Sequence, residues 1–217
     1  RINIASIFSR FQQTNYVEKL AMSDDPNALN MLGDLFSDPS KAYKVMDDKD
    51  ANNSQGVYSN KNSKSYSNKY FKYNSEIDEV KAAECYEKSA SFGNSEAQAN
   101  YGVCLINGRG ISRDILTGMT NIEKSASQGC IKGLFYLGMC HLKGFGVSKV
   151  DLKAAEKYLQ MASEALDNNI INVNESIVCK AIFNLALVME KNKKIDEAAK
   201  CLRKAAILAI KSKINFT

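Results

Sequence analysis

Two closely spaced glycines recur along this chain, and their spacing constrains the fold more than any other feature of the sequence. Gly108 and Gly110 return as Gly144 and Gly146, a period of 36 residues. The flanking residues repeat as well, since "SASFG" in one copy becomes "SASQG" in the next. A fixed period of this length is typical of arrays of helical hairpins.

The glycine pairs also raise the question of a phosphate-binding loop, in which backbone N–H groups approach an anion closely. A Walker-type loop requires Lys and then Ser or Thr after its last glycine, but Ile111 follows Gly110. The dinucleotide fingerprint requires a third glycine, where the two copies have Arg113 and Lys149. We therefore expect the glycines to end helices rather than to bind a ligand.

Each repeat is interpreted as two short helices. Apolar residues at helical spacing predict a first helix over about 95–107, which the glycine pair ends. Asp114 then stands where a helix begins, and a second apolar stripe predicts a helix that ends at Gly129. Small residues recur where the two helices would pack together: Gly102 and Gly138 in the first helix, and Ala82, Gly118, Ala154 and Ala198 in the second.

This order of residues resembles the Sel-1-like repeat, a relative of the tetratricopeptide repeat. The resemblance is carried by "AQANYGVCLINGRGISRDILTGMTNIEKSASQG" and by "GLFYLGMCHLKGFGVSKVDLKAAEKYLQMA", in which Asp151 is slipped by one place. It implies an all-α fold, a right-handed superhelical solenoid of antiparallel helix-turn-helix repeats. We expect residues 1–217 to form a single array. Its expected units are about 26–93 with a low-complexity insertion at 37–76, then 94–129, 130–164, and 175–212 as a tetratricopeptide-like cap.

The sequence offers no catalytic, cofactor-binding or metal-binding set. His141 is the only histidine, at the repeat position that Leu105 occupies in the previous copy, so we expect it to pack between helices. The absence of a C-x-x-C pair beside this single histidine argues against a zinc site. We therefore predict no catalytic residue, no cofactor and no metal, and do not expect an enzyme.

Composition bears on the compartment. No run of residues reaches the ~18 apolar positions of a membrane span, so no membrane span is expected. Some bacterial relatives are stapled by cysteine pairs at a fixed short separation, and the six cysteines here do not follow that pattern. Reduced thiols in a cytoplasmic or mitochondrial compartment are therefore favoured. The family's best-known eukaryotic member works in the endoplasmic reticulum, which stays open as an alternative.

The first residue is Arg1, so the sequence is interpreted as a processed chain or a fragment. Residues 1–17 contain no acid and have a partly amphipathic pattern. Two interpretations stay open, a remnant of an organellar targeting segment or a plain first helix that packs on the next hairpin.

The resemblance implies a non-catalytic protein–protein interaction scaffold or adaptor, as a subunit of a larger complex. Arrays of this kind leave an extended groove, lined by the first helix of each repeat, that accepts peptides, helices or neighbouring subunits. The candidate groove residues are those of the first helices that are neither small packing positions nor loop glycines: Asn100, Val103, Asn107 and Lys143.

Two basic segments leave an alternative open. Residues 51–75 interleave lysines with aromatic residues, and Tyr66 and Tyr70 are candidates for anchoring a protein partner or for stacking on RNA bases. From Lys191 to the end, eight Lys or Arg residues stand against two acids. The candidate contacts there are Lys193, Lys194 and Lys204. The alternative function is an RNA-associated organellar or ribosomal accessory protein.

Overall fold

The computed structural model describes residues 24–38, 78–165 and 174–212. These residues form eight α-helices and no strand. The helices are α2 (Pro26–Ser37), α3 (Glu79–Ser91), α4 (Ser95–Asn107), α5 (Ile115–Ser127), α6 (Ile131–Lys143), α7 (Leu152–Ser163), α8 (Glu175–Lys191) and α9 (Ile195–Ser212).

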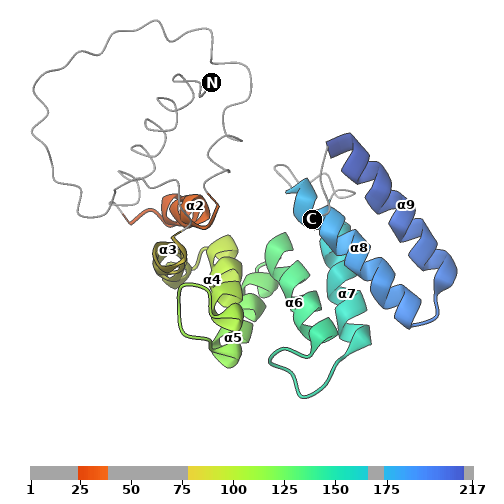
Figure 1. The fold of residues 1–217 in the computed structure, drawn as a ribbon, viewed down its shortest axis with the longest axis horizontal. Coiled ribbons are helices and arrows are strands. Elements are labelled where there is room, and N and C mark those ends of the chain that lie inside the picture. Colours follow the sequence, from red (N-terminus) through yellow and green to blue (C-terminus); the bar gives the residue numbers. More distant parts are fainter. Residues whose placement is uncertain (1–23, 39–77, 166–173, 213–217) are drawn as a thin grey trace, which may run out of the picture.

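Consecutive helices pair as hairpins: α2 with α3, α4 with α5, α6 with α7, and α8 with α9. Each hairpin packs against the next, so that the hairpins follow one another along a curved row (Figure 1). The prediction of an all-α solenoid of helical hairpins is confirmed. The proposed targeting segment or first helix at 1–17, together with Tyr66 and Tyr70, lies outside the described residues.

The helices begin where the sequence places a short polar side chain. The predicted helix at about 95–107 is α4, and Asn94 caps it by accepting a hydrogen bond from the backbone N–H of Ala97 at 2.9 Å. Asp114 caps α5 in the same way, with the N–H of Thr117 at 3.1 Å. Such caps satisfy backbone N–H groups that have no partner inside the helix.

The glycine pair has two separate structural roles. Gly108 ends α4 in the left-handed conformation, with φ 70°, as predicted from the sequence. Gly110 also has a positive φ, of 68°, and its α-carbon lies against the first turn of α3. A Cβ atom there would lie 1.8 Å from the carbonyl oxygen of Glu79. The second glycine therefore lets the loop of one hairpin rest on the backbone of the preceding hairpin.

One prediction about packing is wrong by one residue. Ala154 was expected to face the partner helix, but Ala154 is half-buried and Ala155 has no exposed surface. The cause is that Asp151 stands one residue later in its repeat than Asp114 does in the preceding one. Asp151 caps α7 by accepting a hydrogen bond from the N–H of Ala154. Because the cap sets where the helix begins, the slip turns the buried face of α7 by one residue.

Candidate protein-binding groove

The first helices of the hairpins, α2, α4, α6 and α8, line one side of the curved row. Within the described residues α4 contacts α6 and α6 contacts α8, whereas α3, α5 and α7 make no comparable contacts with one another. Helices on the inner side of a curved array approach each other more closely than those on the outer side. The first helices therefore form the concave side.

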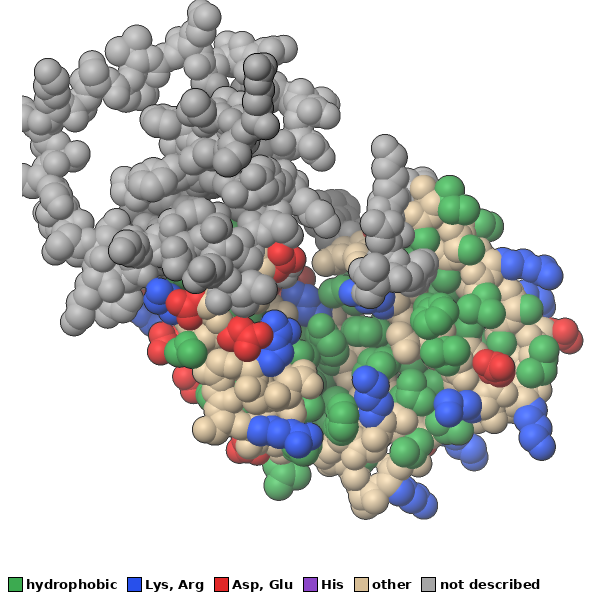
Figure 2. All heavy atoms as spheres, viewed as in Figure 1, with side chains coloured by type: hydrophobic (Ala, Val, Ile, Leu, Met, Phe, Trp, Pro, Cys, Tyr) green, Lys and Arg blue, Asp and Glu red, His purple; other side chains and the backbone are tan. Residues whose placement is uncertain are grey.

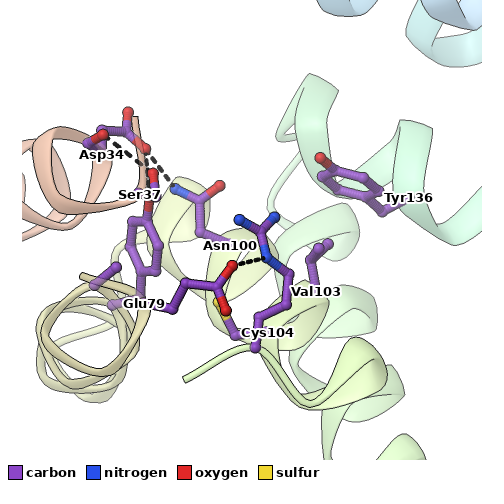
Figure 3. A pocket seen from close by; sticks show the side chains of 10 residues that line it. Asp34, Ser37, Glu79, Asn100, Val103, Cys104 and Tyr136 are labelled. Carbon is purple, nitrogen blue, oxygen red and sulfur yellow. Dashed lines mark hydrogen bonds and ion pairs between the residues drawn. The ribbon is translucent and has the colours of Figure 1, made fainter. Parts of the chain in front are cut away.

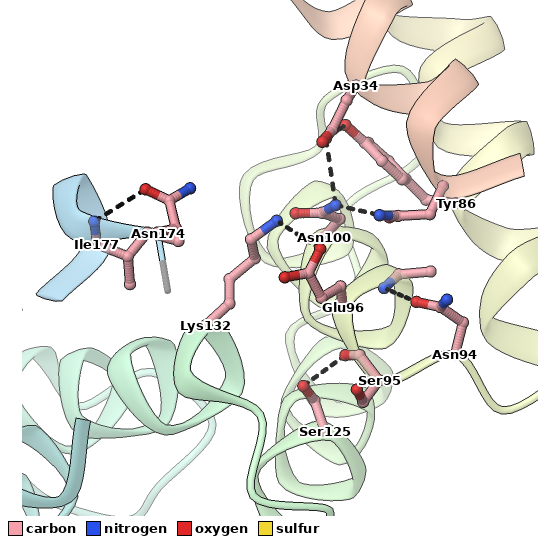
Figure 4. Close-up of polar contacts among 12 residues, drawn as sticks. Asp34, Tyr86, Asn94, Ser95, Glu96, Asn100, Ser125, Lys132, Asn174 and Ile177 are labelled. Atoms are coloured by element: carbon pink, nitrogen blue, oxygen red, sulfur yellow. Dashed lines mark hydrogen bonds and ion pairs between the residues drawn. The ribbon is translucent and has the colours of Figure 1, made fainter. Parts of the chain in front are cut away.

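A polar cavity of about 130 Å³ opens where α2, α3 and α4 meet. The Tyr86 hydroxyl donates a hydrogen bond to Oδ1 of Asp34 at 2.7 Å. Nδ2 of Asn100 donates to Oδ1 of Asn30 at 2.9 Å (Figure 4 shows the Asn100 side chain beside Asp34). Tyr136 of α6 stands across the cavity from Asp34 (Figure 3). These bonds fix α2 against α3 and α4 at this end of the groove.

Arg109, between the two loop glycines, lines the same cavity. Its Nε lies 3.0 Å from Oε1 of Glu79, the first residue of α3 (Figure 3). Both side chains are almost half exposed, so the pair is worth only about 0–1 kcal/mol to stability. The main effect of the bond is to hold the Arg109 guanidinium in place at the edge of the groove.

An apolar cavity of about 150 Å³ adjoins the polar one, between α4 and α6. Val103 and Tyr136 line both cavities, so the two adjoin, and we refer to them together as the groove. The apolar part is lined chiefly by Val103, Ile106, Phe135, Tyr136, Met139 and Phe145.

Asn107 and Lys143 complete the lining of the apolar cavity, and both are exposed. Nδ2 of Asn107 donates to the carbonyl oxygen of Val103 at 2.9 Å. Nζ of Lys143 lies 5.9 Å from the centre of the Phe145 ring, close enough for a cation–π interaction. The structure thus places Asn100, Val103, Asn107 and Lys143 along one groove.

Sequence reasoning missed several groove residues. Tyr136 and Met139 stand one repeat period after Asn100 and Val103, so the register of the repeat was a signal that could have identified them. The same register indicated Asp34, because Gly33 corresponds to Gly102 and Asp34 therefore stands at the repeat position of Val103.

The basic candidates of the last hairpin lie apart from the two cavities. Lys193 is exposed in the turn between α8 and α9, with φ 61°. Nζ of Lys194 lies 2.5 Å from Oε1 of Glu156. Lys204 is exposed on α9. None of these three lysines lines the groove.

Burial raises the pKa of one phenol and two thiols that line the groove. Burial raises the pKa of Tyr86, and the Asp34 carboxylate raises it further. Burial also raises the pKa of the Cys104 thiol, and it raises that of Cys140 to about 11. A protonated thiol is a poor nucleophile, and a protonated phenol donates hydrogen bonds. This chemistry suits binding rather than covalent catalysis.

The remaining candidate for chemistry is His141. Its ring stacks on Tyr158, with centroids 5.6 Å apart, and its Nδ1 is buried without a hydrogen-bond partner in the described part of the chain. This placement fits the expected packing role. No group of three His, Cys, Asp or Glu side chains that could hold a metal ion occurs in the described ranges.

The fold and the groove together define a helical-repeat protein with a concave binding surface. The sequence model of the Sel1 repeat matches residues 73–94, 95–130, 131–165 and 180–209, which is more than half of the chain. The chain belongs to the Sel1 repeat family. Sel1 repeat proteins are a non-catalytic family that generally acts as protein-interaction scaffolds.

Two solved structures are similar to this chain, and the first of them has the same fold. A Sel1 repeat protein from Oxalobacter formigenes matches 90% of this chain and 63% of its own length, with a TM-score of 0.56 at 18% identity. A protective antigen of uropathogenic Escherichia coli with an SLR fold matches 90% of this chain and 41% of its own, with a TM-score of 0.49 at 17% identity. The chain thus spans less than two thirds of either. No curated protein sequence matches this chain.

None of the described helices is long and apolar enough to cross a membrane.

Proposed function

We propose that this chain is a non-catalytic adaptor that holds a protein partner in the groove along α2, α4 and α6, as one subunit of a larger complex. The observation that carries the proposal is the pair of adjoining cavities that share Val103 and Tyr136. They offer an apolar depression beside a row of polar side chains, and peptide-binding sites combine these two features.

Two groove side chains still have hydrogen-bonding capacity. The Tyr136 hydroxyl has no hydrogen-bond partner in the described structure, and Oδ1 of Asn100 accepts no hydrogen bond there. The hydroxyl can donate to a backbone carbonyl or accept from a backbone N–H of a bound segment, and the amide oxygen can accept from a backbone N–H. Such backbone contacts add affinity to the contacts that apolar side chains make.

A photo-crosslinking residue at position 107 tests the proposal. Asn107 is exposed at the edge of the apolar cavity, and Lys124, exposed near the end of α5, provides a matched position on a second helix. In the native source, we expect a reproducible set of proteins to crosslink from position 107 and not from position 124. Equal crosslinking from both positions would contradict groove binding.

The alternative, an RNA-associated accessory protein, draws on the exposed Lys193 and Lys204 of the last hairpin. Phosphate contacts by lysine make binding steeply dependent on salt. Recovery of RNA that is lost at high salt and after charge reversal at these two lysines would replace the adaptor proposal. Recovery of proteins through position 107, insensitive to these reversals, would support it.

A further inference from the structure

The groove carries an unbalanced positive charge beside its apolar cavity. Lys143 lines that cavity, and among the described residues it has no acidic partner. Its Nζ makes a cation–π contact with the Phe145 ring. Two other cations of α6 and of the loop after α4 do have acidic partners: Arg109 pairs with Glu79 at 3.0 Å, and Lys132 pairs with Glu96 at 3.9 Å. Of the cations that line the two cavities in the described ranges, Lys143 is therefore the one without an acidic partner, and it can bind an external carboxylate.

Charge also varies along the concave side. The polar cavity contains the carboxylates of Asp34 and Glu79 beside Arg109, whereas the lining of the apolar cavity contains no acid. Figure 2 shows hydrophobic side chains gathered where α6 and α8 lie in Figure 1, while most acidic side chains on this face lie toward α3 and α4. A ligand that seats an acid at Lys143 thus avoids the carboxylates of the polar end.

The size of the apolar cavity limits what it can hold. An apolar cavity of ~150 Å³ in a protein accommodates a benzene-sized molecule, and this cavity has about the same volume. One Leu, Met or Phe side chain of a partner therefore fits it. An extended chain advances ~3.5 Å per residue, and Nζ of Lys143 lies 5.9 Å from the Phe145 ring of the cavity wall. The matching acid then stands a few positions at most from the apolar residue.

We propose that the groove recognises a linear segment of a partner protein in which an acidic residue lies within a few positions of a Leu, Met or Phe anchor. The anchor fills the cavity between α4 and α6, the carboxylate binds Lys143, and the segment's backbone runs past Tyr136 toward Asn100. This inference rests on the proposed adaptor function and specifies the chemistry of the partner. A nucleic acid fits less well, because phosphates would approach Asp34 and Glu79 in the adjoining cavity.

Selection from a displayed library of short random peptides tests the inference directly. The full chain serves as bait, and the enriched peptides are then measured by fluorescence polarisation. We expect Asp or Glu to be enriched close to Leu, Met or Phe. Lys143→Glu should weaken binding about tenfold or more, since it replaces attraction by like-charge repulsion. Lys124→Glu reverses a lysine in the last turn of α5, outside the groove, and should leave affinity unchanged.

Two further measurements separate charge from shape. A peptide whose acid is replaced by Lys should bind the Lys143→Glu variant more tightly than it binds the original chain. Val103→Phe fills the cavity from its partly exposed wall and should abolish binding, whereas Leu116→Phe, at a side chain that is 73% exposed on α5, should not. Thermal melts of the variants establish that each one is folded.

The outcomes distinguish the inference from the proposed function. Peptides that lose binding with Val103→Phe but are indifferent to Lys143→Glu would overturn the acidic-anchor inference and leave the groove as the binding site. Peptides that bind every variant equally would overturn both. A bait that enriches no peptide but retains RNA in a salt-dependent manner would also overturn both.

Discussion

Gly102 of α4 and Gly118 of α5 face each other across one hairpin, each against the other's carbonyl oxygen. A Cβ atom on Gly102 would lie 2.7 Å from the Gly118 oxygen, and one on Gly118 would lie 2.8 Å from the Gly102 oxygen. The backbones of the two helices therefore approach each other closely at this point. This close approach keeps the two helices together while α4 presents its other side to the groove.

Gly102→Ala should destabilise the chain. In an exposed helix interior this change stabilises by about 1 kcal/mol, but here the new methyl group meets the Gly118 oxygen and should cost about 1–3 kcal/mol instead. Urea unfolding followed by circular dichroism shows whether the substitution lowers or raises the free energy of unfolding. A variant that is more stable than the original would contradict the close approach.

Gly110→Ala should cost more than Gly129→Ala. Both glycines have positive φ, 68° and 75°, so each substitution carries the left-handed strain of about 1–2 kcal/mol. A Cβ at Gly129 meets nothing within 4 Å, whereas one at Gly110 would lie 1.8 Å from the Glu79 oxygen. Melting temperatures of the two variants give the comparison. Equal losses would mean that the loop does not rest on α3.

Ser125→Ala should lower stability by about 1 kcal/mol, the usual net value of a hydrogen bond. Ser125 is fully buried, and its Oγ donates to the carbonyl oxygen of Ser95 at 2.6 Å, which joins α5 to the first turn of α4 (Figure 4). Ser127 is exposed and bonds only within α5, so Ser127→Ala should change the free energy of unfolding by less than about 0.5 kcal/mol. Equal effects in denaturant titrations would argue against the inter-helix bond.

The Asp78 cap predicts a dependence on pH. Hydrogen bonds from the backbone N–H and the side chain of Lys81 lower the pKa of Asp78. A lowered folded-state pKa stabilises the fold above the unfolded pKa of ~3.9, and this stabilisation is lost as the pH falls through the folded-state value. Asp78→Ala should therefore cost about 1 kcal/mol at pH 7 and less near pH 3.

Asp78→Asn provides the control for the charge. It keeps an N-cap acceptor for α3 but cannot titrate, so its effect on unfolding should vary with pH as that of Asp78→Ala does, whereas its cost at pH 7 should be smaller because an uncharged cap acceptor remains. Guanidinium unfolding at several pH values between neutral and acidic makes the comparison. A difference in unfolding free energy between the original chain and Asp78→Asn that stays constant with pH would show that the cap's charge is not linked to folding.

The sequence by itself determined the helices and their ends, because these depend on neighbours in the chain. Asn94, Asp114 and Gly108 cap or end helices through contacts a few residues away, and their spacing made the repeat visible. The period of 36 residues also specified which helices form hairpins, since each helix must bury its apolar stripe against the next.

Only the tertiary structure decided which side chains meet in the groove. Tyr86 and Asp34 are 52 residues apart in sequence, yet they are joined by a hydrogen bond of 2.7 Å. Among the residues that the structure describes, Lys143 has no acidic partner, although Arg109, which lines the adjoining cavity, has Glu79. Such pairings depend on the angle and distance between whole helices. These are set by the summed packing of many residues, which no local pattern in the chain encodes.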